Sequence, residues 1–127
     1  LKARQKLPRL IANGKLLNFP VVGKVPLAYL FDVGFTRDVW MHRIDIYTAV
    51  GRAPELDDHD RRIVEDIVAE WAGTHGEPFT LHLTGPAGGH YASGTGGDEV
   101  DIDALEFGRT LAGRRSGDGV LRHPLPL

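Results

Sequence analysis

The chain has 127 residues with 42% hydrophobic and 25% charged residues, the size and composition of an ordinary globular domain. No apolar run is longer than a few residues, which excludes a transmembrane helix. The chain contains no cysteine, which excludes disulfides and thiolate metal ligands and is typical of a cytoplasmic protein.

The net charge of −2 conceals a strong division of charge along the chain. Residues 1–24 hold six basic residues and no acidic one, whereas residues 53–127 hold six arginines and fourteen acids. A basic segment raises the question of nucleic acid or membrane binding. However, Phe19 is its only aromatic residue and two prolines interrupt any helical face, so we expect neither partner. Packing against an acidic surface fits the segment better, and a DNA-binding arm is the remaining alternative.

Residues 1–24 are interrupted by Pro8, Asn13-Gly14, Pro20 and Gly23, so we expect only a short helical turn or two and then a connecting segment. A long helix follows over residues 27–50. Pro26 suits a first-turn position and Gly51 suits the residue after the last turn. Such a helix has nothing in residues 1–52 to bury its apolar side against.

Residues 53–127 predict a compact set of helices and strands. Asp57 and Asp60 begin a helix whose apolar stripe runs from Ile63 to Trp71, and Gly76 ends it. Alternating residues from Phe79 to Thr84 predict a half-buried strand. The glycine-rich stretch 85–97 predicts turns on both sides of a short hairpin strand over residues 90–93.

The remaining elements complete an α+β fold. Residues 99–102 continue as a strand, and Asp103 with Glu106 opens a third helix that reaches Ala112. The apolar tail 120–127 contains two prolines and is expected to be extended or at a sheet edge. The sequence therefore predicts two parts: residues 1–52 with a long bundle-type helix, and residues 53–127 as a small α+β domain with a mainly antiparallel sheet.

The stretch TRDVWMHRID, residues 36–45, offers the clearest candidate for chemistry. Asp38 and His42 lie one helical turn apart, and Asp45 follows three residues later. A carboxylate and an imidazole at this spacing can provide two ligands of a divalent metal, and Asp45 could accept the second ring N–H of His42. The alternative is a helical Asp–His pair with no ligand.

Two arginines, one in the third helix and one just after it, are candidates for binding an anion. Arg109 and Arg114 carry guanidinium groups that can hold the carboxylate of an anionic substrate. Their alternative role is a surface charge near a helix C-terminus. The polar side of the strand that holds His82 is expected to face solvent. The glycine-rich stretch lacks the Gly-Lys-Ser/Thr of a phosphate loop.

Four phrases together carry a family resemblance. TRDVWMHRIDI is followed by EWA at residues 70–72, LTGPAGG at 83–89 and LEFGRTLAGR at 105–114. In these phrases the chain, from about residue 26 onward, resembles the mycothiol-dependent maleylpyruvate isomerases. That family joins a DinB-like four-helix metal-binding bundle to a C-terminal domain similar to sterol carrier proteins.

The resemblance implies that the chain is a C-terminal part of such a protein. Residues 1–52 would be the lead-in and last helix of the bundle, and residues 53–127 the sterol-carrier-like domain. The metal, zinc by preference, would be held by Asp38 and His42 together with a histidine of the preceding helices. Asp38 stands where the family's isomerases are expected to have Glu. By their guanidinium chemistry, and not by the resemblance, Arg109 and Arg114 are the candidate catalytic residues of this chain.

The expected function is therefore that of a metal-dependent isomerase or transferase that uses a mycothiol-type thiol and a small-molecule substrate. Residues 1–127 are expected to be inactive unless the missing helices come from a preceding segment or a domain-swapped homo-oligomer. The alternative is a non-catalytic module that binds an apolar small molecule or a protein, in which Asp38 and His42 are structural.

Overall fold

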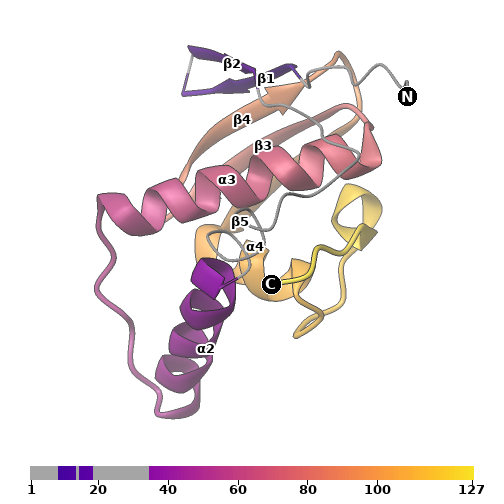
Figure 1. Cartoon of the computed structure of the whole chain (residues 1–127). Coiled ribbons are helices and arrows are strands. Elements are labelled where there is room, and N and C mark those ends of the chain that lie inside the picture. Colours follow the sequence, from indigo (N-terminus) through magenta and orange to yellow (C-terminus); the bar gives the residue numbers. More distant parts are fainter. Residues whose placement is uncertain (1–8, 14, 19–34) are drawn as a thin grey trace.

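The computed structural model describes residues 9–13, 15–18 and 35–127. Its five strands form one sheet in the order β2-β1-β4-β3-β5, in which only β3 and β5 pair in parallel (Figure 1). This arrangement confirms the α+β class and the mainly antiparallel sheet. The elements are β1 (Arg9–Ala12), β2 (Lys15–Asn18), α2 (Thr36–Ala49), α3 (Asp58–His75), β3 (Phe79–Thr84), β4 (Gly89–Ser93), β5 (Asp98–Asp103), α4 (Ala104–Leu111) and the 3-10 helix η2 (Gly119–Arg122).

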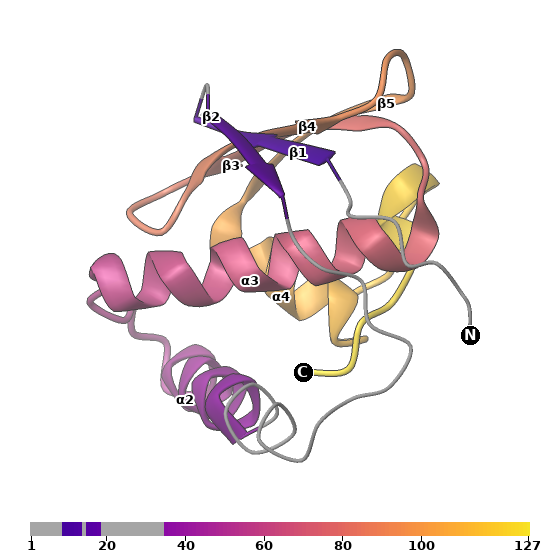
Figure 2. The same cartoon turned by 45° about the horizontal axis from the view of Figure 1, so that its top comes forward.

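The described helices lie on one side of the sheet and leave its other side open (Figure 2). The alternation predicted for β3 is confirmed: Phe79, Leu81 and Leu83 are buried while the residues between them are not. They pack against the predicted stripe of α3, which is buried from Ile63 to Trp71. Burial of this stripe and of the inner side of the sheet removes apolar surface from water and holds the two layers together.

Helix α3 begins and ends as its sequence predicts. The Asp57 carboxylate accepts hydrogen bonds from the backbone N–H groups of His59 and Asp60, and the Asp60 carboxylate accepts one from the Asp57 N–H. This reciprocal capping satisfies N–H groups that the first turn leaves without partners. Gly76 follows the helix with φ +68°, a left-handed conformation that suits glycine.

The prediction of a helical turn within residues 1–24 is wrong for the residues that the structure describes there. β1 and β2 form an antiparallel hairpin instead, with Arg9 opposite Asn18 and Ala12 opposite Lys15. Asn-Gly between two strand segments is a strong hairpin signal, and here it outweighs the disruptive effect of the surrounding prolines. β1 also pairs with β4, so this basic segment extends the sheet.

The chain turns on both sides of β4 as expected, at residues 85–88 and 94–97, but only the first turn joins two neighbouring strands. β3 and β4 form an antiparallel hairpin, but β5 pairs with the other edge of β3. The loop from β4 to β5 therefore crosses the start of β3. A Cβ built on Gly97 would lie 2.1 Å from the Pro78 carbonyl oxygen, which explains the need for glycine where the two backbones cross.

Helix α2 is the described part of the long helix predicted over residues 27–50. Residues 27–34 of that prediction lie outside the described residues. Its predicted end is confirmed, because the helix stops at Ala49 and Gly51 has φ +70°. Trp40, Met41 and Ile44 belong to the same core as α3 and the sheet, so the segments on both sides of residue 52 pack on one core. None of the described helices is long and apolar enough to cross a membrane.

Helix α4 lies between α2 and the sheet. The Asp103 carboxylate accepts hydrogen bonds from the N–H groups of Leu105 and Glu106, as the predicted cap requires. The tail after α4 first forms η2 and then runs back along the helix, where the Leu125 N–H bonds to the Leu111 carbonyl. The expectation that this tail is extended or at a sheet edge is therefore only partly met.

Candidate functional site

The predicted metal-binding pair lies on the exposed side of α2. Nε2 of His42 lies 3.5 Å from Oδ1 of Asp38, and the two side chains are 66% and 58% exposed. The contact follows from their spacing of one helical turn. Both side chains thus remain accessible to an ion or to another segment.

Asp45, one turn further along α2, binds two arginines. Its carboxylate accepts hydrogen bonds from Nη2 and Nε of Arg114, at 2.6 and 3.2 Å. Nη1 of Arg109 lies 3.5 Å from the same carboxylate. The hydrogen bond from Arg114 is the main reason that the pKa of Asp45 lies below its ordinary value, and the charges of Arg109 and His42 act in the same direction. Asp45 therefore accepts from an arginine, and not from the His42 ring as the sequence suggested.

The fold thus brings together residues predicted from two distant parts of the chain. Asp45 and Arg114 are 69 positions apart, and they meet because the end of α4 packs against α2. The close packing is visible at Gly108, where an added Cβ would lie 3.4 Å from atoms of both Trp40 and Met41. The charge of Asp38 also raises the pKa of Arg114, behind the larger effect of its bond with Asp45. We call the resulting cluster the α2–α4 charge cluster; its members are Asp38, His42, Asp45, Arg109 and Arg114.

The two arginines differ in how far they are available to a ligand. The side chain of Arg109 is 15% exposed, and that of Arg114 is 32% exposed. Arg109 also approaches Glu106 at 3.5 Å. Arg114 is therefore the better placed of the two to exchange its carboxylate partner for one on a substrate.

Within the described parts of the chain, no three or more His, Cys, Asp or Glu side chains form a group that could hold a metal ion. Asp38 and His42 can provide two ligands, fewer than a closed site requires. The described residues therefore fit one part of a metal site.

The exposed side of α2 is apolar as well as charged. Phe35, Val39, Ile46 and Val50 are each between 59% and 64% exposed. At 100° per residue these positions lie on the side of the helix that carries His42, opposite the buried Trp40, Met41 and Ile44. We call this set the α2 outer stripe; its members are Phe35, Asp38, Val39, His42, Ile46 and Val50. An apolar stripe that surrounds an acid–histidine pair is typical of a helix that meets a further partner on that side.

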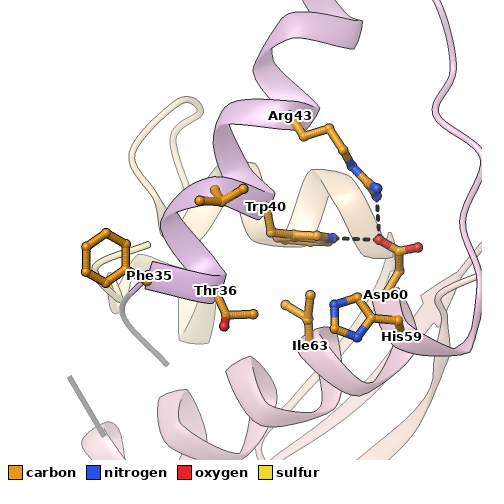
Figure 3. A pocket seen from close by; sticks show the side chains of 8 residues that line it. Phe35, Thr36, Trp40, Arg43, His59, Asp60 and Ile63 are labelled. Carbon is orange, nitrogen blue, oxygen red and sulfur yellow. Dashed lines mark hydrogen bonds and ion pairs between the residues drawn. The ribbon is translucent and has the colours of Figure 1, made fainter. Parts of the chain in front are cut away.

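A pocket of about 350 Å³ opens beside the stripe, between α2 and the start of α3 (Figure 3). At its floor the buried Asp60 carboxylate accepts hydrogen bonds from the Trp40 indole N–H, at 2.9 Å, and from Arg43, at 2.5 Å. Burial acts to raise the pKa of Asp60, but the hydrogen bonds from Asp57 and Trp40 and the charge of Arg43 outweigh it and hold that pKa below its ordinary value. The lining residues are Phe35, Thr36, Val39, Trp40, Arg43, His59, Asp60 and Ile63.

The sequence did not predict this pocket. Asp60 was expected only to help begin its helix. No local pattern links two residues 20 positions apart, so the bond between Trp40 and Asp60 has no sequence signal that we can name. A buried tryptophan needs a hydrogen-bond acceptor for its indole N–H. This general rule indicates that Trp40 has a partner, but not which residue it is.

Comparisons with known proteins add no relative. No family model matches the chain, and neither a curated protein nor a solved structure matches it significantly. The resemblance to the maleylpyruvate isomerases therefore remains a prediction from the four sequence phrases.

Proposed function

We propose that this chain provides part of the active site of a metal-dependent isomerase or transferase that uses a mycothiol-type thiol and acts in the cytoplasm. Asp38 and His42 contribute two ligands of a divalent ion, zinc by preference. The remaining ligand comes from preceding helices or from a second copy of the chain, packed on the α2 outer stripe. Such an ion would lower the pKa of a thiol bound to it, so that the thiol is present as the thiolate.

One observation supports this proposal most strongly. The candidate metal ligands and the candidate anion-binding arginines lie in separate segments, yet Asp45, three residues after His42 on α2, binds Arg114 and lies 3.5 Å from Arg109. A substrate or thiol carboxylate bound by Arg114 would lie next to the acid–histidine pair. The apolar members of the α2 outer stripe would exclude water from such a site once a partner covers them.

The role of the metal pair can be tested by following the histidine ring signals of the full chain by NMR while Zn²⁺ is added. We expect the His42 ring to shift, and His42→Ala to abolish the zinc response at α2. His59→Ala is the matched control, because His59 also lies on an exposed helical turn, and it should leave the His42 response unchanged. An unmoved His42 ring at millimolar Zn²⁺ contradicts the proposal.

A second function, binding of an apolar small molecule without catalysis, is favoured by the pocket between α2 and α3. Phe35, Val39 and Ile63 give it an apolar wall, and Arg43 lies at its edge with a side chain that is 43% exposed. Such a site suits an apolar molecule with a carboxylate. Its occupation would change the fluorescence of Trp40, which lines the pocket.

The two functions are separated by a pair of matched substitutions. Val39→Asp places a charge in the pocket wall, whereas Val50→Asp does the same outside the pocket at nearly equal exposure, 62% against 61%. A binding module loses affinity for a fluorescent fatty acid only in Val39→Asp and is unaffected by His42→Ala. Equal affinity in both valine variants contradicts the pocket as a binding site.

A further inference from the structure

The open side of the sheet carries a histidine pair that neither proposed function uses. His82 of β3 lies directly opposite His90 of β4, and Asp101 of β5 lies beside His82 on its other edge. Because residues in register share one side of a sheet, these side chains form a row across three neighbouring strands. Because Leu81 and Leu83 on either side of His82 are buried in the core, the row lies on the opposite side of the sheet.

The two imidazole rings are already close together. Their centroids are 4.0 Å apart and their planes differ by 11°. An imidazole nitrogen binds a zinc-like ion at about 2.0–2.1 Å, so the two nitrogens that share an ion lie within about 4 Å of each other. Because a ring nitrogen binds a metal in the plane of its ring, the stacked rings must turn about their side-chain bonds so that one nitrogen of each points at the same ion.

Asp101 approaches the His82 ring from the neighbouring strand. Its Oδ2 lies 3.4 Å from Nδ1 of His82, so a proton on Nδ1 would point toward the carboxylate and Nε2 would be available to a metal. Carboxylates commonly position metal-binding histidines in this way. Asp101 is accompanied on the same side of β5 by Glu99 and Asp103, so the strand adds negative charge that attracts a cation.

The backbone of His90 is held in place from the opposite side. Its N–H donates to the Asn13 Oδ1 at 3.1 Å, and its carbonyl accepts from the Asn13 N–H at 2.7 Å. His82 is held in the central strand of the three. The two rings therefore project from a rigid surface, and both are accessible, since the His82 side chain is 41% exposed and His90 is also exposed.

We propose that His82 and His90 form a surface site for one divalent transition-metal ion of the kind that imidazole prefers, such as Ni²⁺, Cu²⁺ or Zn²⁺, with Asp101 as a positioning residue. The two histidines provide the protein ligands, and water fills the other positions. The site is mononuclear and independent of the α2–α4 charge cluster.

The test is a calorimetric titration of the full chain with Ni²⁺ in a non-chelating buffer, together with NMR detection of the histidine rings. We expect one ion per chain at this site and perturbation of the His82 and His90 signals. His82→Ala and His90→Ala should each weaken this binding at least tenfold, and Asp101→Ala about tenfold. All three side chains are exposed, so the variants are expected to fold, and circular dichroism confirms this.

His42→Ala and His59→Ala are the controls, and neither should change Ni²⁺ affinity at the sheet more than twofold. In the wild-type chain, no Ni²⁺ response of His82 and His90 together with a clear His42 response to Zn²⁺ contradicts only this inference. A response of His82 and His90 without one of His42 contradicts only the function proposed for α2. Equal Ni²⁺ affinity in the wild type and in both sheet-histidine variants would overturn the site. One ion per two chains would also overturn it, because the ion would then bridge two copies.

Discussion

Trp40 donates its indole N–H to the Asp60 carboxylate across 2.9 Å, and both residues are at least 96% buried. The same oxygen accepts from Arg43, while the other oxygen accepts from the Asp57 N–H at 2.8 Å. A single carboxylate thus caps α3 and fixes α2 against it. Because α2 carries the candidate metal ligands, this bond also sets where they lie relative to the rest of the fold.

Replacing Asp60 should therefore destabilise the protein more than the loss of a helix cap alone. Asp60→Ala leaves the buried Trp40 N–H without its acceptor, and we expect a loss of about 2–4 kcal/mol in the free energy of unfolding. Asp57→Ala, which removes only a cap, should cost about 1 kcal/mol. Urea unfolding measures both, and equal losses in the two variants would contradict the role given to the Trp40 bond.

The sequence predicted those elements whose signals are local. The capping residues of α3 lie next to the helix that they cap, and the alternation of β3 is contained in six residues. The same holds for Asp38 and His42, whose contact depends only on their spacing along one helix. Local periodicity was therefore sufficient to predict helix α3, strand β3 and the Asp38–His42 pair of the candidate site.

What the sequence did not predict depends on contacts between distant segments. Nothing in residues 94–103 says that β5 pairs with the far edge of β3, since its pattern suits either edge. Asp45 was expected to face His42, but the packing of α4 on α2 supplies a stronger partner in Arg114. The hairpin of β1 and β2 is different, because its Asn13-Gly14 signal is local. In the structure this signal outweighs the disruptive effect of the surrounding prolines.

The crossing loop makes a prediction about two neighbouring glycines. Gly96 and Gly97 both have positive φ, +75° and +82°, but only Gly97 meets another backbone, that of Pro78. Gly96→Ala should cost about 1–2 kcal/mol through backbone strain alone. Gly97→Ala should cost at least about 3 kcal/mol, because β5 must move away from β3. Urea unfolding and the soluble yield measure the difference, and similar stabilities would argue against the crossing.

Tyr91 is a buried residue whose hydroxyl group does not contribute to the stability of the fold. It is 1% exposed, and its hydroxyl has no hydrogen-bond partner in the described part of the chain. Burial, aided by the charge of Glu65, raises its pKa to about 12. Tyr91→Phe removes the unsatisfied hydroxyl, so stability should stay the same or rise by up to about 1 kcal/mol.

The matched contrast for Tyr91 is Thr110, a buried residue whose hydroxyl donates to the Glu106 carbonyl at 2.7 Å. Thr110→Val removes a satisfied hydroxyl of the same general kind and should cost about 1 kcal/mol. Thermal and urea unfolding of both variants test the comparison. A Tyr91→Phe variant less stable than Thr110→Val would show that the tyrosine hydroxyl has a partner after all.

His75 should make the stability of the protein depend on pH. Its Nδ1 accepts the Glu77 N–H at 2.9 Å, and its ring stacks on His123 with centroids 4.9 Å apart. Burial first, and then the charge of His123, lower its pKa from 6.5 to about 4. The folded protein therefore binds this proton less readily than the unfolded chain. Stability is complete above pH 6.5 and falls as the pH approaches 4.

The fall amounts to at most about 3 kcal/mol, at 1.36 kcal/mol for each pKa unit, and solvent around the partly exposed ring reduces it. His75→Asn keeps an acceptor for the Glu77 N–H but cannot take up a proton, so its stability should change much less over this range. His59→Asn, at an exposed position, should keep the wild-type profile. Urea unfolding between pH 7.5 and 5 measures all three. Over this range Glu77 adds little loss of its own, because the loss from its lowered pKa begins near its ordinary pKa of 4.5. If His75→Asn keeps the wild-type slope, the proton uptake belongs to another group.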